Sequence, residues 1–367
     1  MRIAYVCYWN KLSRDGVEKK IAAQTGRWSA VGHEVDVFCL SRAAESHPSW
    51  RTVRFSSVQE RPAATLRLMR EIAARDPDIV YLRYDVFVPP LTRVLRRFPS
   101  VIEINADDRE EARLRTKRRR RGVAYNAISR ALHLRAADGL VCVTHELARS
   151  PSFAAFRKPT IVIGNGVDLD VVQPLPAPRN AQPRVAFLGS VNQTWHGVDK
   201  LLDLARALPE WEFDIVGYEP GRLPGAPPPN VAAHGSLPRE DYEPILGRAD
   251  VAVGTLGLHR KNMREACPLK VREYLAYGLP TIIGYEDTDF VGETPWFLLR
   301  LPNVEQNVRN GVDDVRAFVQ SVLGRRVPRE QVSDRIGARP KEARRIAFFE
   351  SVVAARGAPQ SSSIASR

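Results

Sequence analysis

Hydrophobic and polar positions alternate along the chain in blocks that predict strands followed by helices. The sequence opens with a hydrophobic run at 2–9, a polar loop, an amphipathic stretch at 17–31 and a second hydrophobic run at 34–40. Because parallel neighbouring strands need a crossover helix, this opening predicts a β-loop-α-β unit and a doubly wound sheet. Further hydrophobic runs predict strands at 79–83, 101–104, 140–144 and 160–163.

The same pattern starts again in the second half of the chain. A hydrophobic run at 184–189 is followed by a polar loop, a helix predicted at 198–208 and a strand at 212–217. The segment 173–183 is rich in proline and poor in apolar residues, which is typical of a linker between domains. Later elements are predicted as strands at 231–234, 250–255 and 280–284 and as helices at 239–246 and 268–277.

The repeat predicts an α/β protein of two Rossmann-like domains, each a doubly wound parallel sheet, facing each other across a cleft. Such sheets bind ligands beyond the carboxyl ends of their strands. A length of 367 residues suits two domains. We expect the first domain at 1–170 and the second at 171–350, with a disordered tail at 357–367.

Composition indicates a globular protein that contacts anions. Apolar residues make up 44% of the chain, and its formal charge is +13. The four cysteines form no CxxC pair, so buried thiols in a reducing cytosol are favoured over disulfides or a metal site. No run approaches the roughly 18 apolar residues of a spanning helix, and the first strand lacks a signal-peptide cleavage site. We therefore expect a cytoplasmic protein that needs no metal and touches membranes only peripherally.

The segment 265–278, EACPLKVREYLAYG, is the most informative stretch. Pro268 suits the first position of a helix, where its missing N–H is harmless, and Gly278 suits the end. Lys270 would then lie in the first turn, where the helix dipole disfavours a cation unless an anion binds nearby. A diphosphate would remove that conflict, whereas the alternative is a solvated lysine on an ordinary helix.

This segment resembles the retaining GT-B glycosyltransferases of family 4, whose hallmark is a Glu, seven intervening residues, a second Glu and a helix of the type EYLAxGxP. Glu265, CPLK at 267–270, EYLA at 273–276 and GLP at 278–280 match that pattern in order. The resemblance implies that Glu265 holds hydroxyls of the donor sugar and Glu273 the nucleotide ribose, because a carboxylate accepts hydrogen bonds from two adjacent hydroxyls. It implies catalytic roles for Glu265 and Lys270. Two solvated glutamates are the alternative.

Other stretches resemble the same family, with one departure in the loop after the strand at 184–189. NGVD at 165–168, GSVNQTWHGVDKLL at 189–202 and ADGLVCVTHEL at 137–147 match family segments. Many members carry Arg and Lys in the donor loop to neutralise the diphosphate, where this chain has Ser190 and His196. His196 is either a ligand contact or an ordinary loop histidine. The positive charge would come from Lys270, Arg264, Lys261 or Arg260. The residues that the resemblance assigns to donor binding are Gly189, Ser190, His196, Gly197, Arg264, Cys267, Pro268, Leu269 and Glu273.

In the first domain the resemblance places the acceptor side of the cleft in two loops. Their candidate residues are Asp15, Gly16, Asn105, Asp107 and Asp108. Gly16 stands where the family usually has two glycines and would allow close backbone approach, although an ordinary helix start is the alternative. The histidine that many members have near Asn105 is absent, so no single base is named. In the scheme proposed for this family, the departing phosphate takes the acceptor's proton, and the enzyme stabilises the developing charges.

The densest charge run, RTKRRRR at 115–121, indicates an anionic contact. Its cations are Arg115, Lys117, Arg118, Arg119, Arg120 and Arg121. Such clusters favour anionic lipid headgroups or a lipid-diphosphate acceptor, whereas a solvated helix face is the alternative. Nucleic acid fits less well, because no aromatic platform or helix-turn-helix pattern accompanies the run.

Taken together, these features predict a retaining glycosyltransferase. It would move a sugar from a nucleotide-diphosphate sugar, its co-substrate, to a hydroxyl of a small molecule, glycan or lipid-linked acceptor, in polysaccharide, glycolipid or natural-product glycoside biosynthesis. One alternative is a catalytically silent partner subunit that binds a nucleotide sugar, with Ser190 and His196 as its signature. Another is a basic adaptor for nucleic acid or membrane, which would show steep salt dependence and no turnover.

Overall fold

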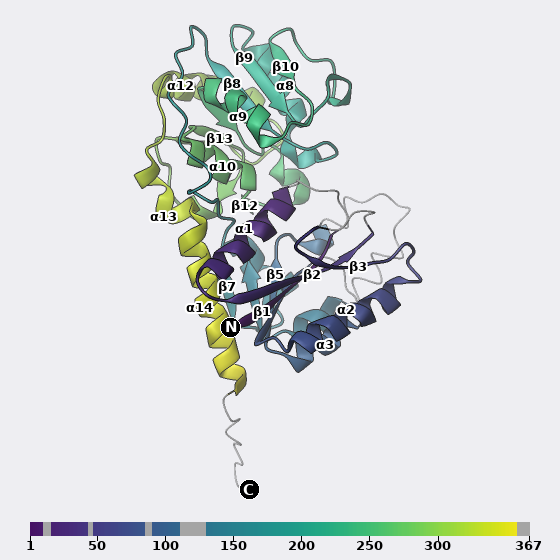
Figure 1. The fold of residues 1–367 in the computed structure, drawn as a ribbon. Coiled ribbons are helices and arrows are strands. Elements are labelled where there is room, and N and C mark those ends of the chain that lie inside the picture. The colour runs from purple at the N-terminus through teal and green to yellow at the C-terminus, as the bar shows by residue number, and fades with distance from the viewer. Residues whose placement is uncertain (10–15, 43–46, 85–89, 111–129, 358–367) are drawn as a thin grey trace. The chain divides into compact units, whose positions relative to one another are not determined.

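The computed structural model describes residues 1–9, 16–42, 47–84, 90–110 and 130–357. Contacts divide the chain into two compact units (Figure 1). Unit 1 contains the chain up to Cys142, residues 147–163, and the chain from Glu342 onward. Unit 2 contains Val143–Glu146 and Gly164–Lys341.

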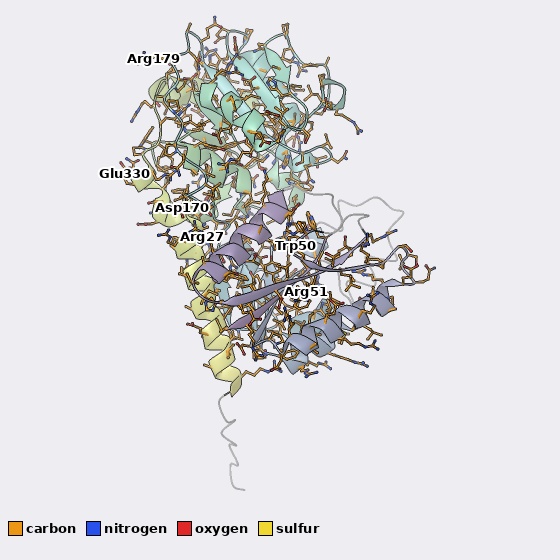
Figure 2. The ribbon with its side chains drawn as sticks, viewed as in Figure 1. Arg27, Trp50, Arg51, Asp170, Arg179 and Glu330 are labelled. Carbon is orange, nitrogen blue, oxygen red and sulfur yellow. The ribbon has the colours of Figure 1, made fainter. Side chains whose placement is uncertain are left out.

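The described part of unit 1 is built on a seven-stranded parallel sheet in the order β3-β2-β1-β4-β5-β6-β7. The strands are β1 (Arg2–Tyr8), β2 (Glu34–Ser41), β3 (Arg51–Arg54), β4 (Ile79–Arg83), β5 (Ser100–Ile104), β6 (Gly139–Cys142) and β7 (Thr160–Val162). The described helices are α1 (Gly16–Ala30), α2 (Arg61–Arg75), α3 (Leu91–Arg97), α6 (His145–Arg149), α7 (Pro151–Ala154) and α14 (Ala338–Gly357). Helices α6 and α14 begin in unit 2 and continue into unit 1. Trp50 and Arg51, labelled in Figure 2, lie at the start of the edge strand β3.

Four aromatic side chains hold the helices on one face of this sheet. The indole of Trp28 on α1 lies 6.0 Å from the Tyr5 ring, 5.6 Å from the Tyr81 ring and 5.5 Å from the Phe349 ring. All four residues are fully buried, and tilted or edge-on rings suit their quadrupoles. Phe349 lies on α14, and Glu342 on the same helix accepts a hydrogen bond from the Trp28 indole at 2.9 Å.

Unit 2 repeats the plan with a six-stranded parallel sheet in the order β10-β9-β8-β11-β13-β15, all of it within the described residues. The strands are β8 (Arg184–Leu188), β9 (Glu212–Val216), β10 (Val231–Ala233), β11 (Val251–Val253), β13 (Thr281–Ile283) and β15 (Leu298–Arg300), and a small separate pair is β12 (Glu265–Ala266) with β14 (Glu286–Asp287). The α-helices are α8 (Val198–Ala207), α9 (Arg239–Arg248), α10 (Leu269–Tyr277), α11 (Asn307–Asn310), α12 (Val312–Val322) and α13 (Ser333–Ile336). Short 3₁₀ turns include η2 (Thr194–His196) and η4 (Leu258–Lys261).

The strand order of unit 2 places a ligand site at a definite point. From β8 the chain proceeds to β9 and β10 on one side, and then crosses to β11 and β13 on the other. Loops diverge at such a switch point and leave room beyond the carboxyl ends of the two central strands. The loops after β8 and β11 therefore border the candidate site.

The prediction of two doubly wound parallel sheets is confirmed. The contact division differs from the expected domain ranges in three places: residues 143–146 and 164–170 belong to unit 2, and residues 342–357 of α14 belong to unit 1. The buried contacts of Glu342 and Phe349 with Trp28 explain this placement. The sequence patterns also missed strand β3 and helix α2, whereas the predicted tail from 358 onward lies outside the described residues.

Candidate functional site

The loop after β8 is shaped by two glycines that approach each other closely. Gly217 follows β9 with φ +94°, and a Cβ there would overlap the carbonyl oxygen of Gly189. Gly189 donates its N–H to the carbonyl of Val216 at 2.9 Å. Gly197 ends η2 in the left-handed region at φ +73° and precedes α8. These positions require glycine, so the loop 189–197 keeps a fixed backbone path at the switch point.

His196 faces back into this loop as a neutral imidazole. Its Nδ1 accepts a hydrogen bond from the N–H of Ser190 at 3.4 Å, which leaves the proton on Nε2. The ring packs edge-on against Phe187, with 6.0 Å between centroids. Burial, with the charges of Lys270 and Lys261, lowers the pKa of His196 to about 2. His196 can therefore offer an N–H donor but no charge.

Helix α10 begins one residue later than the sequence predicts. Pro268 is the N-cap, with extended backbone at ψ 140°, and Leu269 is the first helical residue. No described side chain caps the first turn, so its free N–H groups lack a side-chain acceptor. Gly278 ends the helix at φ +83°, as predicted.

Lys270 carries an ammonium group that has no hydrogen-bond partner among the described residues. The side chain is half-buried, but its Nζ is shielded from solvent and lies 4.2 Å from the centroid of the Phe187 ring. Burial lowers the pKa of Lys270 to about 7. Burying a cation whose only favourable contact is an aromatic ring destabilises the fold. A bound anion would offset this destabilisation by pairing with the ammonium.

Glu265 is held by two residues of the segment 143–146, which belongs to unit 2. Its Oε1 accepts hydrogen bonds from the N–H of His145 at 2.9 Å and from His145 Nδ1 at 3.0 Å, and its Oε2 accepts from the N–H of Glu146 at 2.8 Å. In return, the Glu146 carboxylate accepts from the N–H groups of Arg264 and Glu265, both at 2.8 Å. A carboxylate has about four acceptor positions, so Glu265 retains one, on Oε2. No sequence pattern predicted this arrangement.

Glu273 projects from α10 toward helix α9. The phenol of Tyr242 on α9 donates to the Glu273 carboxylate at 2.6 Å. Beside them, the Tyr277 hydroxyl donates to Glu243 at 2.8 Å. Burial and the charge of Glu273 raise the pKa of Tyr242, so this tyrosine remains a donor at any working pH. The carboxylate of Glu273 is thus held in one orientation.

A network of ion pairs holds the first turns of α10 in place. The Arg272 guanidinium pairs with Asp287 and Asp289, and Lys341 donates to Asp289 at 2.6 Å. The Cys267 thiol lies 3.8 Å from Asp289, and burial raises its pKa to about 12, so it is an inert thiol. These residues fix the backbone before Lys270, and the sequence pattern indicated only Cys267 among them.

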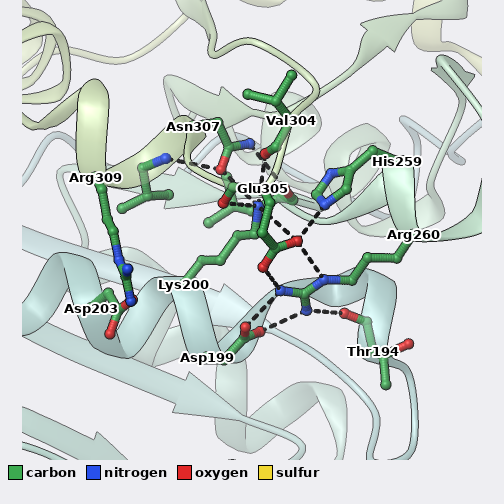
Figure 3. A network of polar contacts seen from close by, with 12 residues as sticks. Thr194, Asp199, Lys200, Asp203, His259, Arg260, Val304, Glu305, Asn307 and Arg309 are labelled. Atoms are coloured by element: carbon green, nitrogen blue, oxygen red, sulfur yellow. Dashed lines mark hydrogen bonds and ion pairs between the residues drawn. The ribbon is translucent and has the colours of Figure 1, made fainter.

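Arg260, one of the cations that the sequence offers for a diphosphate, is held by carboxylates instead (Figure 3). Its guanidinium donates to both oxygens of Asp199, at 2.9 and 2.7 Å, and to Glu305 at 2.5 Å. Lys200 beside it donates to the carbonyl of Glu305 at 2.7 Å. Lys261 lies with its Nζ 4.3 Å from the centroid of the Trp195 ring.

An open cavity of about 520 Å³ lies at the carboxyl ends of β13 and β15. Arg264 lines it with an exposed side chain that forms no ion pair among the described residues. The ion pair of Arg300 with Glu286 lies in its wall. The cavity adjoins Glu265 through Arg264 but does not include Lys270. Its lining consists of His259, Asn262, Met263, Arg264, Tyr285, Glu286, Arg300, Leu301, Pro302 and Asn303.

The acceptor-side candidates in unit 1 have different surroundings. Gly16 is the first residue of α1, and Asn105 accepts a hydrogen bond from Lys20 at 2.9 Å. Asp108 forms two hydrogen bonds with Arg130, both at 2.9 Å, which is a structural ion pair. Asp107 is buried and accepts from the N–H of residue 109 at 2.9 Å.

Asp15 and the basic run 115–121 lie outside the described residues. Within the described ranges, no cluster of three or more His, Cys, Asp or Glu side chains is arranged to hold a metal ion. In the same ranges, every helix is too short or too polar to cross a membrane.

Comparison with known proteins gives one family and many structural neighbours. The sequence model of Glycosyltransferase Family 4 matches residues 14–171. No curated protein sequence matches significantly. Sucrose-phosphate synthase from Thermosynechococcus elongatus superposes with a TM-score of 0.72 over 97% of this chain and 100% of that chain, at 16% identity.

Two further neighbours were solved with a nucleotide sugar. Anabaena HepE in complex with UDP-glucose has a TM-score of 0.61 at 12% identity, over 95% of this chain and 99% of that chain. An alpha-glucosyltransferase in complex with UDP-glucose and DNA has a TM-score of 0.63 at 12% identity, over 95% and 99%. At such identities these likenesses establish the fold. The chain therefore has the GT-B fold, two doubly wound parallel sheets, and its residues 14–171 match the model of Glycosyltransferase Family 4.

Proposed function

We propose that the chain transfers a sugar from a nucleotide-diphosphate sugar to a hydroxyl acceptor, with retention of anomeric configuration. The observation that carries this proposal is the shielded, unpaired ammonium of Lys270 in the first turn of α10. A diphosphate placed there would supply the missing anion. The Nε2–H of His196 and the free N–H groups of α10 would add uncharged donors to the same phosphate oxygens.

The two glutamates of the family motif would bind the rest of the donor. With one acceptor position left on its Oε2, Glu265 would bind a single sugar hydroxyl, and Glu273 would bind the ribose. The neighbours solved with UDP-glucose make UDP-sugars the first donors to test. The cation of Lys270 would neutralise the leaving group, so we expect turnover to survive chelation of divalent metals.

Retention would follow from a front-face mechanism in which the departing phosphate accepts the proton of the acceptor hydroxyl. The candidates near the acceptor, Asp15, Gly16, Asn105 and Asp107, would then position this hydroxyl and need not act as a base. Asp108 fits this role least, because Arg130 occupies its carboxylate. The anomeric configuration of the product, read by proton NMR, tests retention directly.

We place the protein at the cytoplasmic face of a membrane, where the basic run 115–121 would meet a lipid-linked or glycan acceptor. Salt-dependent vesicle binding and transfer to lipid-linked acceptors would test this placement.

The decisive experiment combines ligand screening with donor hydrolysis. A thermal-shift screen of UDP-, GDP-, ADP- and dTDP-sugars should give the largest stabilisation with the true donor, because a ligand of the native state raises its stability. Glu265→Gln should then abolish turnover while leaving the thermal shift, and Lys270→Met should reduce both. Lys158→Met is the matched control, since Lys158 bonds only the carbonyl of Arg135 at an exposed position.

Two results would refute the proposal in different ways. A thermal shift without hydrolysis or transfer in the wild type would favour the silent partner subunit. Ser190 and His196, in place of the usual basic residues, would then mark the loss of activity. The absence of any shift with all four donor classes would remove the nucleotide-sugar assignment itself.

A further inference from the structure

The solvent-facing side of helices α2 and α3 in unit 1 is strongly basic. On α3 the exposed positions are Arg93, Arg96 and Arg97, so each of them is an arginine. On α2, which is described throughout, no exposed position carries a carboxylate, and Arg67 and Arg70 lie near its middle. We call these five arginines the basic face.

The arginines of the basic face repel one another. Arg93 and Arg97 are four residues apart on one helix, and Arg67 and Arg70 are three apart, which places like charges side by side. None of the five forms an ion pair with a described residue. Arg75, at the end of α2, differs because it pairs with Asp36 at 3.0 Å. An ordinary solvated helix mixes both signs of charge, so this arrangement indicates an anionic partner.

The two helices form one continuous surface with an apolar component. Helices α2 and α3 pack against each other beside the sheet of unit 1 (Figure 1). Leu66, exposed to 40%, lies in the same stripe of α2 as Arg67 and Arg70. Arginines around an exposed leucine on helices lying side by side are the features of a surface that rests on lipid headgroups.

We propose that the basic face docks unit 1 onto an anionic lipid bilayer. This surface is separate from the sequence run 115–121 and does not depend on the donor site. A bilayer suits it better than a nucleic acid, because its exposed positions include no aromatic side chain on which bases could stack. Each arginine near such a surface contributes about a fivefold gain in partitioning.

The test compares two charge-matched triple variants of the full chain. The first, Arg67→Glu, Arg70→Glu and Arg96→Glu, reverses the basic face. The control variant carries Arg179→Glu, Arg222→Glu and Arg248→Glu, all at exposed positions of unit 2, with Arg179 labelled in Figure 2. Both variants change the formal charge equally. Co-sedimentation with phosphatidylcholine vesicles that contain about one third phosphatidylglycerol gives the partition coefficient.

The basic-face variant should bind these vesicles about 100-fold more weakly than the wild type, whereas the control should lose far less. Binding of the wild type should also weaken as salt is raised, and pure phosphatidylcholine should not bind. Equal loss in both triple variants would show a general charge effect and overturn the proposal. So would unchanged binding of the basic-face variant, or a wild type that binds single-stranded DNA more tightly than the vesicles.

Folding is controlled separately. The melting temperature of both variants is compared with that of the wild type, and the triple Gln variant at the same three positions removes charge without reversing it. If the Glu variant unfolds, the Gln variant decides the outcome, with a loss of about 100-fold expected from removing three arginines at about fivefold each.

Discussion

Replacing Lys270 by methionine should strengthen the fold and weaken donor binding at the same time. The substitution keeps an unbranched side chain of similar length and removes the shielded ammonium. In the ligand-free protein that ammonium has only the Phe187 ring as a favourable contact, 4.2 Å away. A residue retained for binding is expected to cost stability in the empty state.

The magnitude follows from the pKa. Burial lowers the pKa of Lys270 from 10.5 to about 7, so in the window between these values the unfolded chain holds a proton that the folded chain has released. The destabilisation is complete below pH 7, shrinks as pH rises and vanishes above pH 10.5. At pH 8 it amounts to about 3 kcal/mol. Because the folded lysine is mostly neutral at this pH, little cation–π energy is lost with it, and we expect a gain of about 3 kcal/mol for Lys270→Met.

Donor binding should weaken as pH rises, whereas the destabilisation of the ligand-free protein by Lys270 shrinks as pH rises. If the diphosphate binds the protonated lysine, wild-type affinity for a nucleotide sugar should fall by about 50-fold between pH 7 and pH 9, because the ammonium must first be protonated. The diphosphate of a nucleotide sugar does not itself titrate in this range. Lys270→Met should bind weakly at both pH values, with a flat profile.

Denaturant unfolding at pH 8 and calorimetric titration at pH 7, 8 and 9 measure both effects. Lys158→Met should match the wild type in each experiment. A Lys270→Met protein that is less stable than the wild type, or that binds the donor as tightly, would refute the reasoning. The first result would mean that Lys270 is held by packing, and the second that the diphosphate binds elsewhere.

Three further substitutions test the surroundings of this lysine. Tyr242→Phe should weaken nucleotide affinity about tenfold, because Glu273 loses the phenol that orients it at 2.6 Å, and the loss should disappear for a 2′,3′-dideoxyribose nucleotide. An equal loss with both nucleotides would contradict the ribose assignment. Arg272→Met should cost about 3–5 kcal/mol in denaturant unfolding, because the buried Asp287 carboxylate loses its cation, and a smaller cost would mean that Asp287 is already protonated. Gly217→Ala should cost about 2 kcal/mol or more and lower donor affinity, because its Cβ would displace Gly189, and wild-type affinity would exclude this loop from the site.

The sequence was informative wherever a local rule fixes the structure. The succession of apolar runs and amphipathic stretches predicted two doubly wound sheets, because strand and helix periods are set by neighbouring residues. Gly278 was placed correctly as the end of α10, since glycine tolerates φ +83°. The start of that helix was misplaced by one residue, because proline serves equally at the N-cap that precedes it. Strand β3, with four residues, is too short to give a clear pattern, whereas α2 was not predicted although Ala64, Leu68 and Ile72 recur at helical spacing.

Only the tertiary structure decided which charges remain available for a ligand. Arg260 and Lys270 lie ten residues apart and looked equivalent as diphosphate contacts, yet folding brings Asp199 and Glu305 to the first and only an aromatic ring to the second. Likewise, Tyr242 meets Glu273 across 31 positions of sequence. A residue's type and spacing follow from the chain itself, but its partners depend on where distant loops close, and that is set by the packing of whole sheets and helices.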